Sequence, residues 1–349
     1  MRRYITSIMV LLLLFSSCEH KELCYHHPHT AKVRIDVDWS QFNLEVPTGM
    51  SVMIYSTEGE QIMRHLTNDI THALVDLEAG LYNTIVFNQS DYEFGSVDFV
   101  GMDNFFTAEV HSKITESRWY TRAGEDEKLA MQPEWIGSDY CTDVEVTQSM
   151  IDITTAEYIE SLSRTYKSKE KRTRSQFTIA QLTPQNFVHT ITITVHLKNI
   201  YNLRSARASL TGLASGYSFS KEEPTENTVT QLLESWSVAR DPDDPTLGYI
   251  TAQITSMGLP YGHTGQPNDN EFVLSVLLVD NETVVDIPFS IGDKFEKVYD
   301  QTGRYNLDLE VELWAEDPLP DVKPSGEEDG GFDAIVDEWG EEENVDIPM

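Results

Sequence analysis

Basic residues are scarce in this 349-residue chain, which carries 25 Lys and Arg against 58 Asp and Glu and has a formal net charge of −33. Binding to nucleic acid needs clustered cations that contact phosphates and release counterions. A surface with this charge repels nucleic acid and anionic lipid headgroups alike. The composition therefore excludes nucleic acid as a partner.

Catalytic signatures are missing as well. The chain has no G-x-S-x-G elbow, no H-E-x-x-H and no P-loop. A glycosidase-like pair of carboxylates can be drawn from 58 acidic residues in many ways, so such a pair carries little information. Two acidic loops, at residues 241–245 and 267–271, lack the D-x-[DN]-x-[DN]-G spacing of a calcium loop and are interpreted as solvated turns. We expect a protein that is not an enzyme and has no cofactor and no metal.

The apolar run at the start of the chain is too short to span a membrane. Ile5–Phe15 follows Arg2 and Arg3 and rises ~17 Å as a helix, against a hydrocarbon core of ~30 Å. This order is typical of a secretory signal peptide, which we place at residues 1–17. The segment FSSC that ends at Cys18 resembles the lipobox of bacterial lipoproteins, although leucine is usual where Phe15 stands.

The lipobox resemblance implies that the leader is removed and that Cys18 is acylated on its sulfur and on its new amino terminus. Several acyl chains hold a protein on a membrane where one chain binds reversibly. We therefore predict a lipid-anchored protein that is held on a membrane outside the cytoplasm. The alternative is a plain secretory signal with a cysteine nearby by chance.

Cysteine is rare too, with two residues besides Cys18. Cys24 and Cys141 can form a disulfide in an oxidising compartment, which would tie the tether to the first domain. Two unpaired thiols are equally compatible with the sequence, since it gives no Cα separation. The stretch CEHKELCYHHPH, residues 18–29, also holds four histidines but no second ligand pair on an ordered element follows. We interpret residues 18–30 as a polar tether.

Strand patterns dominate the remaining chain. Apolar and polar side chains alternate in KVRIDVDW (residues 32–39) and most clearly in HTITITVHL (residues 189–197), as in strands with one buried face. Val273–Val279 is almost continuously apolar, which predicts a central strand buried on both faces. Further strand patterns lie at residues 51–55, 72–77, 81–88, 249–255, 283–289 and 305–313. The spacing of these short strand patterns along the chain predicts an all-β protein with two antiparallel β-sandwiches, at residues 31–146 and 185–315.

The segment between these domains, residues 147–184, differs in composition. YKSKEKRTR gathers Lys and Arg in an otherwise acidic chain, and a helical turn is plausible around residues 156–162. We interpret the segment as an exposed linker, with a site of proteolytic maturation as the alternative.

The last segment, residues 316–349, is an acidic tail that also carries apolar side chains. A solvating tail does not need these residues. The tail can hold a terminal strand that pairs with a sheet edge in the same chain or in another chain, or it can be disordered. The candidate strand-pairing residues are Phe332, Ile335, Val336, Trp339, Val345 and Ile347.

Four quoted segments together resemble the Bacteroidetes-type fimbrillin-like lipoproteins, which include fimbrial anchor subunits and relatives without an assigned function. The segments are CEHKELCYHHPH leading into VRIDVDW, LEAGLYNTIVFN, ITITVHLKNIYNLRSARASLTGLASG and GGFDAIVDEWGEEENVDIPM. The resemblance implies two tandem transthyretin-like β-sandwiches, attachment to the outer membrane through Cys18, and pilus subunits as partners. It also implies strand donation between subunits, which is a form of β-augmentation.

We therefore expect a non-catalytic surface lipoprotein, a fimbrial anchor, minor pilus subunit or adhesin, that acts through contacts of strand edges. The alternative is a glycan-binding surface lipoprotein. Exposed aromatic residues are the candidates for that role: Trp119, Tyr120, Trp135 and Tyr140.

Overall fold

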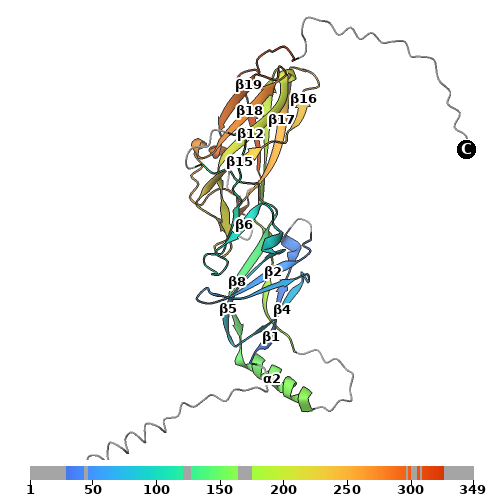
Figure 1. The fold of residues 1–349 in the computed structure, drawn as a ribbon, viewed down its shortest axis with the longest axis vertical. Coiled ribbons are helices and arrows are strands. Elements are labelled where there is room, and N and C mark those ends of the chain that lie inside the picture. Colours follow the sequence, from blue (N-terminus) through green and yellow to red (C-terminus); the bar gives the residue numbers. More distant parts are fainter. Residues whose placement is uncertain are drawn as a thin grey trace, which may run out of the picture. The chain divides into compact units, whose positions relative to one another are not determined.

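The structure is a computed structural model that describes residues 29–42, 46–120, 127–163, 175–295, 298–299, 305–306 and 309–325. These residues form a mainly β protein with several sheets and one α-helix, α2 (Gln148–Ser163) (Figure 1). Contacts divide them into two compact units. The first unit holds residues up to 90, 103–106 and 138–185, and the second holds residues 91–102, 107–137 and those from 186 onward.

The first unit is built on a three-stranded and a five-stranded sheet. The smaller sheet has the order β4-β1-β9 and consists of β1 (Ala31–Val37), β4 (His72–Leu77) and β9 (Phe177–Leu182). The larger sheet has the order β10-β8-β5-β2-β3 and consists of β2 (Met50–Ser56), β3 (Gln61–Thr67), β5 (Gly80–Asn88), β8 (Gly137–Val146) and β10 (Gln185–Asn186).

The core of the first unit is lined from both of these sheets. In β1 the predicted alternation is confirmed, because Val33 and Ile35 are fully buried while Lys32 and Arg34 are partly exposed. Val33 and Ile35 pack in one cluster with Val52 of β2 and with residues of β4, β5, β8 and β9. Burial of such side chains contributes about 1.5–3 kcal/mol each.

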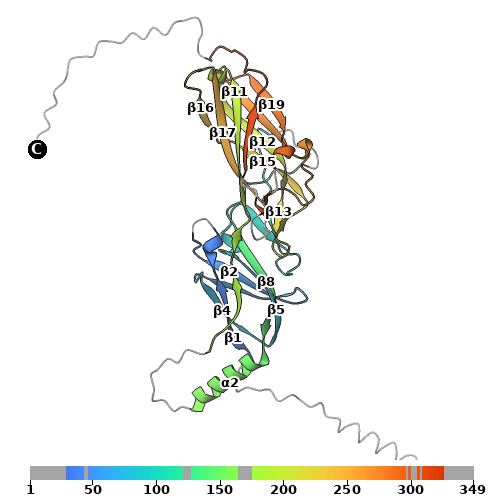
Figure 2. The ribbon, with the colours of Figure 1, turned by 180° about the vertical axis from the view of Figure 1, so that it is seen from behind.

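The interval predicted as a linker contains regular structure where it is described. Helix α2 extends the predicted turn in both directions, lies beside β1 in both views (Figures 1 and 2) and buries Ile151 in the first core. Strand β9 then runs parallel to β1, with Val33 opposite Phe177. Both elements group with the first unit. The domain boundaries given above stay a prediction, and the basic residues 164–174 lie outside the described residues.

Two four-stranded sheets form the main body of the second unit. One has the order β16-β17-β11-β22, with β11 (His189–Lys198), β16 (Ser237–Arg240), β17 (Leu247–Ser256) and β22 (Leu309–Trp314). The other has the order β15-β12-β18-β19, with β12 (Leu203–Ala214), β15 (Thr228–Leu233), β18 (Glu271–Leu278) and β19 (Val284–Ser290) (Figure 1).

Smaller elements complete the two units. A third four-stranded sheet of the second unit has the order β14-β13-β7-β6, with β6 (Val97–Val100), β7 (Glu109–Ser112), β13 (Gly216–Ser218) and β14 (Glu223–Pro224). A two-stranded sheet joins β20 (Val298–Tyr299) and β21 (Tyr305–Asn306). The 3₁₀ turns are η1 (Trp39–Gln41), η2 (Asp91–Glu93), η3 (Ile200–Asn202), η4 (Pro267–Asp269) and η5 (Gly292–Lys294).

The second core is packed between the two larger sheets of that unit. The alternation predicted for β11 is confirmed, since Ile191, Ile193 and Val195 are fully buried. They share one cluster with residues of β12, β15, β17, β18 and β22.

The prediction that β18 is buried on both faces is only half right. Phe272, Leu274, Val276 and Leu278 face the core and are fully buried. On the other face Val273 is buried, but Ser275 and Leu277 are only partly covered, because this face is the floor of an open groove.

The all-β expectation is confirmed as a mainly β structure, but the pairing is not purely antiparallel. Strand β1 is parallel to β9, and β11 is parallel to β22. Parallel neighbours need long connections, so their partners are far apart in the sequence. Within the described residues, no helix is both long enough and apolar enough to cross a bilayer.

Candidate functional site at the edge strand β22

Strand β22 lies at the end of its sheet and pairs with β11 alone among the described residues (β16, β17 and β11 are labelled in Figure 2). Pairing extends from Ile191 opposite Leu309 to His196 opposite Trp314. An edge strand presents unpaired N–H and C=O groups and is a template for another strand. The free edge of β22 is therefore the first candidate for a contact with a partner.

The sequence LEVELW sets both the buried face and the open edge of β22. Val311 and Leu313 are 3% and 5% exposed and fix the strand on the core. The N–H of Ala315 donates to the carbonyl oxygen of His196 over 3.0 Å. Because successive N–H groups of a strand point in opposite directions, Glu312 and Trp314 direct theirs to the open edge.

An aromatic row crosses the outer face of this sheet. The ring of Trp314 stacks on that of His196 with 4.9 Å between centroids and 3° between planes. The ring of Tyr249, which pairs with His196 across the strands, lies 5.7 Å further on at 49°. Trp314 is 61% exposed, so an apolar ring stands at the outermost strand with one side available to a neighbour.

The charge of this edge selects the kind of strand that it can bind. Glu310 and Glu312 are exposed on β22, and Glu312 Oε2 lies 3.8 Å from His196 Nε2. Like charges placed opposite each other destabilise a strand pair, so two copies of this edge repel each other. A strand with Lys or Arg at the facing positions is favoured instead.

The chain that follows β22 is fixed on the second unit as far as Ser325. Leu319 is 2% exposed. Asp321 accepts hydrogen bonds from the Tyr201 hydroxyl at 2.6 Å and from Asn202 Nδ2 at 3.0 Å, and these bonds lower the pKa of the Asp321 carboxyl. The N–H of Ser325 donates to the carbonyl oxygen of Val279 over 3.0 Å.

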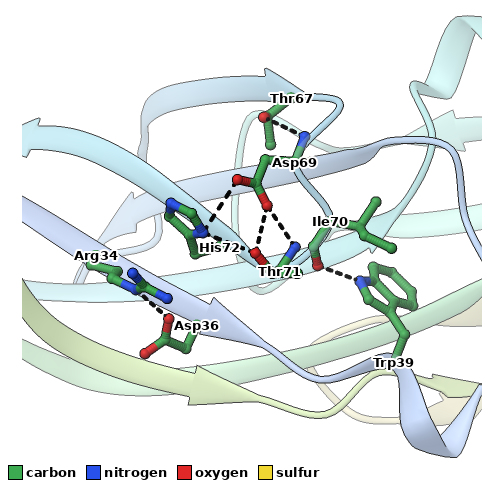
Figure 3. Close-up of polar contacts among 8 residues, drawn as sticks. All are labelled: Arg34, Asp36, Trp39, Thr67, Asp69, Ile70, Thr71 and His72. Carbon is green, nitrogen blue, oxygen red and sulfur yellow. Dashed lines mark hydrogen bonds and ion pairs between the residues drawn. The ribbon is translucent and has the colours of Figure 1, made fainter.

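A polar cluster of the first unit stabilises a turn (Figure 3). Asp69 Oδ1 accepts from the N–H and the hydroxyl of Thr71 at 2.9 and 2.6 Å, and its Oδ2 lies 3.3 Å from His72 Nδ1. The Trp39 indole N–H donates to the carbonyl of Ile70 over 2.9 Å. These contacts close the connection between β3 and β4.

Most of the site residues predicted from the sequence lie outside the described residues. This applies to the lipidation site Cys18, to Cys24 and to the candidate strand residues Phe332, Ile335, Val336, Trp339, Val345 and Ile347. Cys141 is described and lies half-buried in β8, opposite Thr84. Burial, with a further contribution from Asp139, raises the pKa of the Cys141 thiol to about 12. Its pairing with Cys24 stays a prediction.

The four aromatic candidates do not form one platform of coplanar rings. Trp119 and Tyr120 line a groove of the second unit, with 85° between their planes. Trp135 belongs to the second unit and is 37% exposed, whereas Tyr140 belongs to the first unit and packs edge-on against Phe105. Within the described residues, no group of three or more His, Cys, Asp or Glu side chains is arranged to hold a metal ion.

The comparisons with known proteins define the class to which this chain belongs. Residues 17–234 match the family model described as "Domain of unknown function (DUF5119)", and the chain belongs to that family. The fimbrial anchor and adhesin group recognised from the sequence is confirmed by its relatives.

The chain is 20% identical to the Bacteroides ovatus protein described as "Putative fimbrium anchoring subunit Fim4B", over 97% of this chain and 96% of that one. A crystal structure described as a "putative adhesin" from Bacteroides ovatus shares its fold, with a TM-score of 0.54, 14% identity, and coverage of 87% of this chain and 99% of that chain. The fimbrial anchor protein Mfa2 from Porphyromonas gingivalis is similar at a TM-score of 0.47 and 11% identity, over 82% of this chain and 90% of that one.

Two surface residues were missed by the sequence argument, Trp314 and Arg207. The alternation of LEVELW does place Trp314 on the solvent face, and a tryptophan at such a position is a detectable signal. Arg207 carries no comparable signal, because its neighbour Trp119 is 88 positions away and is brought to it only by the fold.

Proposed function

We propose that this protein is a non-catalytic surface lipoprotein that anchors or ends a pilus, and that it does so by pairing the edge of β22 with a strand of another subunit. The open edge of β22 is the observation that carries the proposal, since its outward amides and the exposed Trp314 offer both backbone pairing and an apolar contact. The description of the Bacteroides ovatus relative, which aligns over 97% of this chain, supports the anchoring role.

The proposal also includes the tandem β-sandwiches, the lipid anchor and the position of the subunit in a pilus. Each core is lined from two sheets, which supports two tandem β-sandwiches of the transthyretin-like kind. Acylation of Cys18 would hold them on the outer membrane at the cell surface. The repulsion between two copies of β22 supports a subunit at the base or end of a pilus, because such a subunit binds a different chain and does not polymerise with itself.

A proline at Glu312 tests the edge without disturbing the core. Pro removes an N–H that points away from β11 and leaves the inward amides of Val311 and Leu313 in place. The matched control is Glu312→Thr, which removes the same charge and keeps the N–H. In crosslinking pull-downs from intact cells, we expect wild type to recover another β-rich subunit, the Thr variant to recover it to a lesser extent because the charge is lost, and the Pro variant to recover at least fivefold less than the Thr variant. Equal recovery with all three chains, or no such subunit with any, would refute the proposal.

Truncation before Gly330 distinguishes the roles of the tail. If the tail pairs with β22 of its own chain, its removal opens the edge and raises recovery of the partner. If the tail is donated to another subunit, its removal lowers recovery, and Glu312→Pro has little effect. The anchor is tested separately, because Cys18→Ala should move the protein out of the membrane fraction.

A further inference from the structure

An open groove of about 360 Å³ lies on the outer face of the sheet that contains β12, β18 and β19, within the second unit. This volume is in the range of small-molecule sites, which is about 300–1,000 Å³. The groove is separate from the edge of β22, which belongs to the other large sheet of that unit. Nothing in the proposed function uses it.

The floor of the groove combines the apolar Val273 and Leu277 with several serines. Ser205 and Ser209 flank Arg207 on β12, and Ser275 stands opposite Arg207 on β18. Strands favour β-branched and aromatic residues at such positions. Serines leave a hollow over the sheet and present hydroxyl groups that both donate and accept hydrogen bonds.

The wall of the groove is formed by two aromatic rings that are held in place. The Trp119 indole N–H donates to Glu234 Oε1 over 2.5 Å. The Tyr120 hydroxyl donates to Glu127 Oε1 over 2.8 Å, and Thr230 donates to that same oxygen over 2.5 Å. Rings fixed by such bonds lose little conformational entropy when a ligand binds.

The guanidinium of Arg207 has N–H donors that can bind a ligand. Its guanidinium carbon lies 5.4 Å from the centroid of the Trp119 ring. Within the described residues it forms no ion pair, although the chain carries 58 acidic side chains. A guanidinium has five N–H donors in a planar fork, and these face a groove whose described lining holds one carboxylate, that of Asp286.

The chemistry of this lining points to one class of ligand. A phosphorylated compound would need several cations, and a fatty acyl chain would leave the serine hydroxyls, Arg207 and Asp286 of the lining without hydrogen-bond partners. One Arg and one Asp balance each other in charge. Asp286 accepts a hydrogen bond from the Ser275 hydroxyl at 2.5 Å, which orients its carboxylate in the lining. We propose that the groove binds a neutral saccharide of one or two sugar units, with an apolar C–H face against the Trp119 ring, an edge beside the Tyr120 ring and hydroxyls bound by Arg207, Asp286 and the serines.

The test uses the full chain on an array of immobilised glycans. The neutral probes are cellobiose, maltose, lactose, mannobiose, chitobiose and their longer oligomers, beside sialyllactose and oligogalacturonate as acidic probes. We expect binding to at least one neutral series, with affinity measured by calorimetry. Trp119→Ala and Arg207→Gln should each weaken binding at least tenfold, whereas Tyr261→Ala, which removes a 61% exposed ring elsewhere on the second unit, should leave affinity unchanged.

Three results would overturn the proposal: no neutral glycan bound, binding to acidic glycans alone, or unchanged affinity in both groove variants. Thermal unfolding of Trp119→Ala checks that the variant is folded, and Arg207→Gln provides a second, independent change in the groove. Neither variant touches β22, so a failure here leaves the pull-down result unaffected.

Discussion

The indole ring of Trp314 lies parallel to the imidazole ring of His196, with 3° between the planes and 4.9 Å between the centroids. The spacing equals the distance between neighbouring strands, so the stack ties β22 to β11 on the outer face of the sheet. The edge that we propose as the binding surface is therefore held in place by a contact outside the core.

Replacement of Trp314 by Ala should lower the free energy of unfolding by about 1 kcal/mol, the usual contribution of an aromatic pair. Guanidinium unfolding followed by circular dichroism measures the change. Tyr261→Ala is the matched control, because Tyr261 is also 61% exposed and has no ring partner among the described residues. If both variants lose the same free energy of unfolding, the stack of Trp314 on His196 contributes no stability beyond that of any exposed aromatic ring.

Replacement of Gly212 by Ala should destabilise the second unit strongly. Gly212 has a φ of +75° at an irregularity in the pairing of β12 with β15, and an added Cβ would lie 2.2 Å from the carbonyl oxygen of Asp269. Gly262→Ala separates the strain of a positive φ from the steric clash, since Gly262 has a φ of +81° but open space around it. We expect Gly262→Ala to lower the free energy of unfolding by about 1 kcal/mol, and Gly212→Ala to lower it by at least about 2 kcal/mol more. Equal losses in chemical denaturation would contradict the steric argument.

Asp69 should stabilise the first unit at neutral pH and cease to do so in acid. Its hydrogen bonds to the hydroxyl and the N–H of Thr71 lower the pKa of the Asp69 carboxyl below its ordinary value. A lowered pKa in the folded state gives stability that is present above the unfolded pKa of about 4 and is lost as pH falls through the folded pKa.

Asp69→Asn should therefore melt below wild type at pH 7, and the two melting curves should converge near pH 2. The exposed Asp317, replaced by Asn in the same way, serves as the control and should change the melting temperature little at either pH. A constant difference between Asp69→Asn and wild type across this range would show that the charge of Asp69 is not the cause.

The Cys141 thiol should react slowly while the protein is folded. Its pKa of about 12 leaves roughly one thiolate in 10⁴ at pH 8, and the thiolate is the reactive form. Alkylation by iodoacetamide, followed by mass spectrometry, should be at least 100-fold slower than in denaturant. Rapid labelling of the folded chain would contradict this burial. If denaturant exposes no thiol until a reductant is added, Cys141 is bridged, and Cys24 is its candidate partner.

Strands with a single buried face could be predicted from sequence because alternation records which side meets the core. HTITITVHL places Ile191, Ile193 and Val195 inward, and all three are fully buried. Helix α2 was predicted only as a turn, because its polar and apolar residues segregate weakly around the axis. Ile151 and, in part, Met150 pack on the first core, among the helix residues whose side chains are described.

Contacts between segments that are far apart in the sequence could not be predicted, because the local sequence carries no signal of them. The parallel pairing of Leu309 with Ile191 depends on how the intervening strands pack, and no turn sequence encodes it. The same holds for the groove. The sequence showed Trp119 as an aromatic candidate, but it gave no sign that Arg207 lies over its ring. Val273–Val279 was apolar enough to suggest full burial, yet one of its faces lines that groove.

The position of β22 in the sequence also determines when the second core can close as the chain folds. Val311 and Leu313 lie beside Ile193 and Val195 in the same sheet but 118 positions further along the sequence, so β11 gains these neighbours only when the two distant strands meet. Until then β11 has an apolar, unpaired side, and contacts of such long sequence separation form slowly. The folding chain thus passes through a stage in which this edge of β11 is open to pairing with other strands, and aggregation is most favoured at that stage.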